Sequence, residues 1–203
     1  MTGARELILA SASAGRAAVL RGAGLSFRQV PAEIDERAIE AEASRENGSI
    51  SGEQVAMRLA AEKALAVSRQ HRDALVIGAD QVMSCDGRLF HKPATRDAAR
   101  RQLAELRGRE HFLLAGLGVA HAGELVWDHL GRASLTMRAF SDAFLDNYIA
   151  AEGEDILACV GSYRIEGRGI QLFSRVDGDH FTIIGLPLLP LLDYLRESGW
   201  LAS

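Results

Sequence analysis

The stretch LILASASAGRAAVL, residues 7–20, changes character in its middle. Its first four residues, Leu7 to Ala10, form a short apolar run that is typical of a buried strand. From Arg16 onward the spacing is helical. Small and hydroxyl-bearing residues, among them Ser11 and Ser13, lie between the two parts. The stretch therefore predicts a strand, a loop and a helix, the unit that α/β folds repeat.

The junction between this strand and this helix is a natural anion site. A helix N-terminus presents unpaired N–H groups and a partial positive charge. Ser11, Ser13 and Arg16 would line such a site. A plainer interpretation stays open, in which a serine caps the helix and the arginine lies on the surface.

Composition narrows the class of protein. The chain has 203 residues, of which 48% are apolar and 25% charged, so it can bury a full core. The net charge of −4 argues against a nucleic-acid or membrane-surface binder. Two distant cysteines without metal-site spacing fit a reducing compartment, although a disulfide is possible. We find no signal-peptide or membrane-span pattern and expect a cytoplasmic protein.

Strand and helix patterns alternate along the chain. Strands are expected at 7–10, 74–79, 112–120, 125–128, 132–140 and 170–176, with an extended segment at 27–34. Helices are expected at 16–23, 53–70, 96–107, 142–151 and from Pro187 to Ser198. The short gaps after residue 112 favour antiparallel pairing. The pattern predicts an α/β fold with a mixed sheet and flanking helices, in two lobes around a cleft.

Asp80 follows the apolar run ALVIGA, residues 74–79. Ligands of open α/β sheets lie beyond the carboxyl ends of strands, so Asp80 is placed as a metal ligand or general base, or it simply forms a turn.

Lys63 interrupts a row of apolar residues with helical spacing. The apolar residues of that row are Val55, Leu59 and Val67. It either reaches solvent along its aliphatic stem or points inward toward phosphate.

Three further segments bear charged residues. The acidic segment Glu33 to Glu36 ends an extended run, which is ordinarily a solvated loop. Lys92 precedes Pro93, and Glu166 lies in a glycine-rich segment, GSYRIEGRG, residues 161–169. The glycines indicate either tight turns or backbone close to a ligand. Carboxylates for a divalent metal and cations for phosphates together suggest metal-assisted attack on a phosphoanhydride.

Six ordered motifs resemble those of one family. LILASASAGR, PAEIDE, AEKA, VIGADQV, HKP and GSYRIEGRGIQLF…GDHFTIIGLPL occur in order from residue 7 to residue 188. They resemble the Maf family, the septum-formation-inhibitor-like nucleoside triphosphate pyrophosphatases. The resemblance implies a single domain over residues 1–203, related in fold to inosine triphosphate pyrophosphatases. It also implies hydrolysis of a nucleoside triphosphate to monophosphate and pyrophosphate, a divalent cation (Mg²⁺, Mn²⁺ or Co²⁺) and a homodimer.

The resemblance also implies roles for individual residues. Asp80 matches the catalytic aspartate that activates water, and Glu36 matches a carboxylate that helps to hold the metal with it. The catalytic set is then Asp80, Glu36 and Lys92, and the metal ligands are Glu36 and Asp80. The residues expected to bind substrate are Ser11, Ser13, Arg16, Lys63, Gln81 and Glu166.

The base preference follows from two positions. Gln81 and Glu166 resemble the 7-methyl-GTP-type branch rather than the dTTP/UTP-type branch. A carboxylate accepts from both N1–H and the 2-amino group of guanine, whereas it repels the carbonyls of uracil or thymine. The opening loop departs from the family pattern, with Ala14 and Gly15 before Arg16 in place of a proline and an arginine or aromatic residue. His91 stands where glycine is more common.

Two alternatives remain open at the level of sequence. One is a dTTP/UTP pyrophosphatase of the same family. The other is a non-enzymatic, nucleotide-binding regulator of septation. A regulator of this kind would have the nucleotide-binding cleft but lack the catalytic residues. The residues expected for catalysis and phosphate binding are nevertheless all present: Glu36, Lys63, Asp80 and Lys92.

Overall fold

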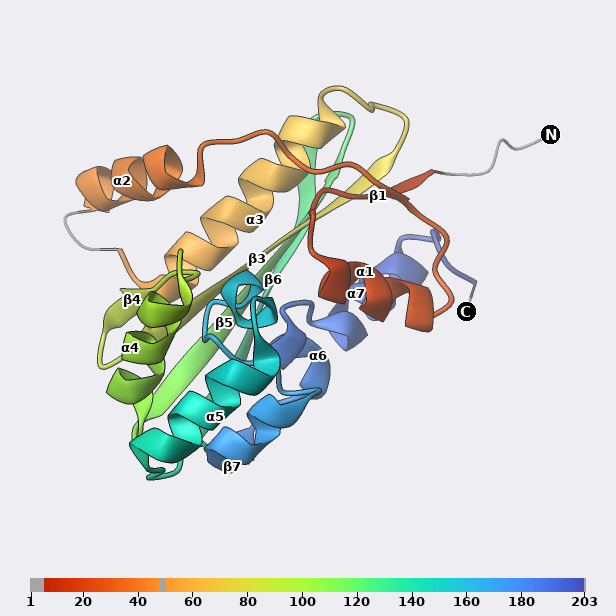
Figure 1. Ribbon diagram of the computed structural model, residues 1–203. Coiled ribbons are helices and arrows are strands. Elements are labelled where there is room, and N and C mark those ends of the chain that lie inside the picture. The colour runs from red at the N-terminus through yellow and green to blue at the C-terminus, as the bar shows by residue number, and fades with distance from the viewer. Residues whose placement is uncertain (1–5, 48–49, 203) are drawn as a thin grey trace.

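One mixed sheet runs through the molecule (Figure 1). The computed structural model describes residues 6–47 and 50–202. The strands are β1 (Leu7–Leu9), β2 (Arg28–Gln29), β3 (Leu75–Cys85), β4 (Arg88–Phe90), β5 (Glu110–His121), β6 (Glu124–Met137) and β7 (Phe173–Asp177). Their order is β2-β1-β3-β5-β6-β7, with β4 paired to β3. β1 is parallel to β2 and β3, and the other pairs are antiparallel. The predicted mixed α/β fold is confirmed.

Helices cover both faces of this sheet (Figure 1). They are α1 (Ala14–Gly22), α2 (Glu36–Asn47), α3 (Gly52–Ser68), α4 (Arg96–Leu106), α5 (Asp142–Glu152), α6 (His180–Ile184) and α7 (Leu188–Glu197). Short 3₁₀ turns occur at Asp155–Ala158 and Arg168–Leu172. Within the described residues, no helix is both long and apolar enough to cross a membrane.

Successive side chains of β3 point to opposite faces of the sheet, so their contacts show which helices cover each face. Leu75, Ile77 and Ala79 pack in a core cluster with residues of α1 and α7. Further along the same face, Met83 and Cys85 pack in a second cluster with residues of α4 and α5. We call the parts of the molecule built around these two clusters its two lobes.

The opposite face of the sheet carries α3, and glycines determine how closely it packs. A Cβ atom on Gly78 would lie 2.1 Å from the carbonyl oxygen of Ala60, and one on Gly116 would lie 2.3 Å from that of Ala56. Both strand positions therefore require glycine, because any side chain would push α3 off the sheet. Gly116 is also the β5 partner of Asp80. The close packing thus holds α3 directly over the part of β3 that bears Asp80.

Several predicted boundaries were wrong. β3 continues from the predicted 74–79 through Asp80 to Cys85, because its antiparallel pairing with β5 runs from Leu75 to Ser84 after β1 has ended. Asp80 therefore lies within a strand and does not form a turn. The predicted strands 125–128 and 132–140 are one strand, β6, because Gly131 stays paired with Ala115 and a Cβ there would meet Pro187 and Thr182.

Other differences concern short or polar elements. Of the extended segment 27–34, only Arg28–Gln29 pairs as a strand, and β7 begins at Phe173 after a 3₁₀ turn. Glu36, expected in an acidic loop, begins α2, a polar helix whose Ile39 packs against a core cluster of α3, β3 and β5 and whose Ala43 is buried. The five-residue α6 was also missed, since it is shorter than one amphipathic repeat.

Candidate active site

Three elements bring Lys63, Glu36 and Asp80 together. The Nζ atom of Lys63 lies 2.6 Å from Oε1 of Glu36 and 2.6 Å from Oδ1 of Asp80. Asp80 faces α3 because it shares a face of β3 with Gly78, two residues earlier. The side chains of Lys63 and Asp80 are 11% and 10% exposed, so Lys63 does not extend into solvent. We call these three residues the lysine–carboxylate cluster.

The cluster has the composition expected around a hydrated divalent cation. Glu36 and Asp80 each place one oxygen beside the same ammonium, so these oxygens are at most twice 2.6 Å apart. Mg²⁺ is commonly held by one or two carboxylates together with phosphate oxygens and water. No group of three or more His, Cys, Asp or Glu side chains with metal-site geometry occurs in residues 6–47 and 50–202. Glu36 and Asp80 therefore suit a cation that arrives with a phosphate ligand.

The opening loop is ordered by its own serines. The hydroxyl of Ser13 accepts from the N–H of Arg16 at 3.3 Å and caps α1. The hydroxyl of Ser11, a buried residue, accepts from the N–H of Ser13 at 3.3 Å. The capping interpretation is thus correct for Ser13. The loop lies where β1 ends, next to the Ala79–Asp80 edge of β3.

Arg16 is bound into the protein rather than lying on its surface. Its Nε donates to the carbonyl of Gly185 at 2.8 Å, and Nη1 donates to the carbonyl of Ala79 at 2.8 Å and to Ser11 Oγ at 3.1 Å. Burial lowers the pKa of Arg16, while the charges of Asp80 and Glu36 act in the opposite direction. Arginine stays protonated under such conditions. Its Nη2 makes no hydrogen bond to any described residue and can serve a phosphate oxygen.

Gln81 points away from the lysine–carboxylate cluster, as the next residue of a strand must. Its Nε2 donates to the carbonyls of Thr182 and Ile183 in α6, at 3.1 and 3.0 Å. The amide N–H groups, expected to meet substrate, are thus engaged with backbone.

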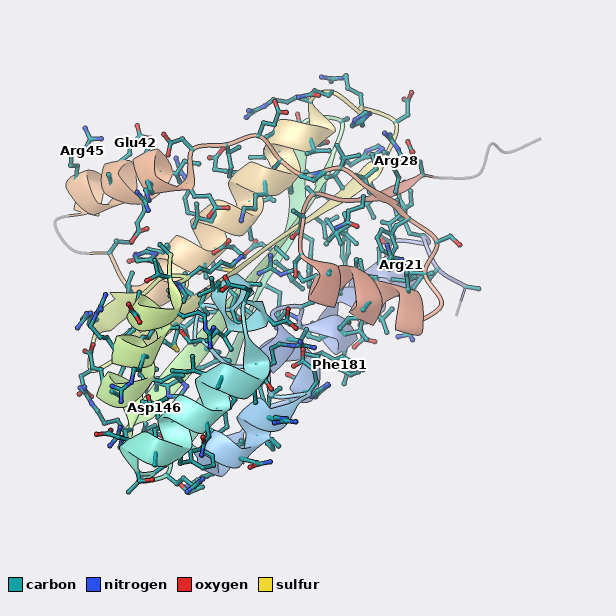
Figure 2. The ribbon with its side chains drawn as sticks, viewed as in Figure 1. Arg21, Arg28, Glu42, Arg45, Asp146 and Phe181 are labelled. Atoms are coloured by element: carbon teal, nitrogen blue, oxygen red, sulfur yellow. The ribbon has the colours of Figure 1, made fainter. Side chains whose placement is uncertain are left out.

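Glu166 lies at a separate, mainly apolar pocket of about 450 Å³ between α1 and α6. Phe181, labelled in Figure 2, belongs to the α6 wall of this pocket. The Glu166 side chain is 45% exposed, and its Oε1 lies 3.7 Å from Nε of Arg164. We call this the α1–α6 pocket. It is lined by Gly15, Ala18, Val19, Gly22, Ala23, Glu166, His180, Phe181, Ile184 and Leu188.

Lys92 is exposed and lies outside the lysine–carboxylate cluster. It shares surroundings with the Glu166 loop. Burial raises the pKa of the Cys159 thiol, Glu166 raises it further, and Arg164 and Lys92 lower it. Lys92, Arg164 and Glu166 therefore all lie within electrostatic range of Cys159.

Sequence reasoning missed a buried pair that supports the Glu166 loop. Nε2 of His111 on β5 lies 2.8 Å from the hydroxyl of Tyr163, and both side chains pack against Phe173. Nδ1 of His111 has no partner among the described residues. The available signal was a histidine directly before the predicted apolar strand at 112–120.

This histidine makes stability depend on pH. Burial lowers the pKa of His111 from 6.5 to about 4. Between these values the unfolded chain binds a proton that the folded protein does not, so stability falls as pH falls. We expect His111 to account for a loss of about 2 kcal/mol in the free energy of unfolding between pH 7 and pH 4.5. Urea unfolding at both pH values measures it. The pH dependence should be shallower in His111→Phe, and identical slopes in both proteins would contradict the assignment.

The fold and the site together define the class: an α/β protein whose site combines a partly buried lysine–carboxylate cluster with a capped helix N-terminus and an arginine. The family is more specific. The protein-family model described as "Maf-like protein" matches residues 6–198 of the sequence, so the chain belongs to the Maf family.

Named relatives match along nearly the whole chain. A "Nucleoside triphosphate pyrophosphatase" of Nitrobacter winogradskyi is 49% identical over 99% of this chain and 97% of its own. A "7-methyl-GTP pyrophosphatase" of Rhizobium meliloti is 49% identical over 95% of this chain and 96% of its own. One of the same name from Mesorhizobium japonicum is 47% identical over 96% of both chains.

Proposed function

We propose that this protein hydrolyses a nucleoside triphosphate to the nucleoside monophosphate and pyrophosphate. The observation that carries the proposal is the lysine–carboxylate cluster beside Arg16 and the capped N-terminus of α1. Cations there neutralise the triphosphate, and a carboxylate is in place to accept a proton. Membership of the Maf family and the names of the relatives support the same activity.

In the proposed reaction, water attacks the α-phosphorus and the α–β anhydride bond breaks, so that pyrophosphate leaves. Asp80 accepts the proton of the attacking water. Lys63, hydrogen-bonded to Asp80, orients that carboxylate and meets phosphate oxygens together with Nη2 of Arg16. Lys92, which is exposed and follows β4, adds a further positive charge for the phosphates. A divalent cation held by Glu36 and Asp80 supplies charge neutralisation when bound.

A panel of purified triphosphates tests the activity. ATP, GTP, CTP, UTP, dTTP and 7-methyl-GTP are each offered with Mg²⁺, Mn²⁺ or Co²⁺, and released pyrophosphate is measured. We expect release with at least one pair. Binding of triphosphate without release under every condition would favour a nucleotide-binding regulator instead.

For the base, we propose 7-methyl-GTP, with the α1–α6 pocket as its site. Glu166 is the carboxylate of that pocket, and Phe181 offers an aromatic surface to a planar base. Methylation at N7 gives the base a positive charge, which favours a carboxylate and an aromatic face. Two of the relatives named above are called 7-methyl-GTP pyrophosphatases.

Glu166→Gln tests this preference. The amide loses one acceptor for the guanine donors and gains a donor that suits a pyrimidine dione. We expect the ratio of kcat/KM for 7-methyl-GTP to that for UTP to fall about 10- to 100-fold. Glu197→Gln, at the exposed end of α7, is the matched control. A wild-type preference for UTP or dTTP, or an unmoved ratio in the variant, would refute base reading by Glu166.

We propose further that the protein is a homodimer and works in the cytoplasm, where free nucleoside triphosphates are found. Family resemblance supports the dimer. Light scattering across a concentration series tests it, and a constant monomer mass would exclude it.

A further inference from the structure

Two side chains hold the C-terminal turn of α6. Gln81 donates to the carbonyls of Thr182 and Ile183, and Arg16 donates to that of Gly185. Gly185 is left-handed, at φ +97°, and a Cβ there would lie 3.3 Å from both Nη2 of Arg16 and Cδ of Gln81. The turn therefore rests directly on these two side chains.

α6 needs such support because it is only five residues long. A helix of this length is unstable on its own, and its last carbonyls have no partners within the helix. The N-terminal end of α6 is capped by Asp179, whose carboxylate accepts from the N–H of Thr182 at 2.9 Å. At the other end, Gln81 and Arg16 donate to the carbonyls of Thr182, Ile183 and Gly185, and the carbonyl of Thr182 also accepts from the N–H of Gly185.

α6 packs against both core clusters. Ile183 packs in the core cluster with α4 and α5, whereas Phe181 packs against the cluster with α1 and α7. His180, Phe181 and Ile184 form one wall of the α1–α6 pocket. A shift of α6 therefore changes the width of that pocket.

We propose that Gln81 is a positioning residue: its amide, together with Arg16, fixes α6 on β3 and thereby sets the shape of the α1–α6 pocket. Gln81 then influences ligand affinity without touching the ligand. Because it directly follows Asp80 on β3, the same strand positions the carboxylate on one face and the pocket wall on the other. The identity of the ligand rests on the proposed function, but the anchoring of α6 does not.

Hydrogen exchange in the ligand-free protein tests the anchoring. The N–H groups of Gly185 and Leu186 both donate to the carbonyl of Phe181, so their exchange reports opening of α6. In Gln81→Met, which keeps the shape but not the donors, we expect these two N–H groups to exchange about 10-fold faster.

Three comparisons control this test. The exchange of the Ala10 N–H, which donates to the carbonyl of Ile77, should be unchanged. Gln81→Glu, which sets a carboxylate against carbonyls, should show a larger effect, and exposed Gln70→Met should show none.

Kinetics with the best triphosphate of the panel give a second readout. KM should rise about 10-fold in Gln81→Met with kcat within about threefold of wild type, the pattern of lost binding. Unchanged exchange at Gly185 and Leu186 would overturn the proposal, and a changed base preference with unchanged exchange would show that Gln81 contacts substrate. Gln81→Asn, which keeps a shorter amide, replaces Gln81→Met if that variant does not fold. Because exchange is measured without ligand, the result stands even if no triphosphate is hydrolysed.

Discussion

Asp80→Asn should lower kcat for pyrophosphate release by about 10²- to 10⁴-fold, the usual loss when a general base is removed. The amide has the same shape as the carboxylate but cannot take a proton or match the charge of a cation. Lys63 keeps Glu36 as an ion-pair partner, so the cluster is not left with an unpaired ammonium. The thermal midpoint should therefore stay close to that of wild type.

Steady-state kinetics and circular dichroism measure this expectation together. Asp73→Asn is the matched control, because Asp73 is exposed and lies shortly before the same strand. Asp80→Asn retaining more than about a tenth of the wild-type kcat would exclude Asp80 as the base.

Lys63→Met should affect both stability and activity. It leaves the Asp80 carboxylate, 10% exposed, without its ammonium partner, and breaking a buried ion pair in this way typically costs about 3–5 kcal/mol. Glu36 is 54% exposed and adds little to that cost, because water solvates it. The loss of a phosphate-binding charge should also reduce kcat/KM by about 100-fold or more.

A double variant separates the two effects. Lys63→Met combined with Asp80→Asn should recover most of the lost unfolding free energy, since neither charge then remains buried, but no activity. Lys92→Ala is the comparison for activity. KM should rise because a phosphate-binding charge is lost. The unfolding free energy should stay unchanged because Lys92 is exposed. Equal stability of Lys63→Met and wild type in urea unfolding would contradict a structural ion pair at Asp80.

Sequence by itself determined the elements whose signals are local. The apolar runs predicted β1 and the first half of β3, and the helical patterns predicted at 96–107 and 142–151 agree closely with α4 and α5. Lys63 and Asp80 lie on a helix and on the strand that follows it, and such elements commonly pack together. The capping role of Ser13 was likewise readable, since it depends only on the next three residues.

Only the tertiary structure decided which partners the polar side chains bind. Arg16 reaches a carbonyl 169 positions away, and Gln81 reaches two that are 101 and 102 positions away. No local pattern encodes such bonds, because they depend on where α6 comes to rest. The length of β3, and with it the position of Asp80 inside a strand, depended on pairing with β5. The physical reason is the same in each case: a hydrogen bond between distant segments depends on the distance between them. That distance is set by the packing of Gly78 and Gly116 against α3 and of the two core clusters around β3.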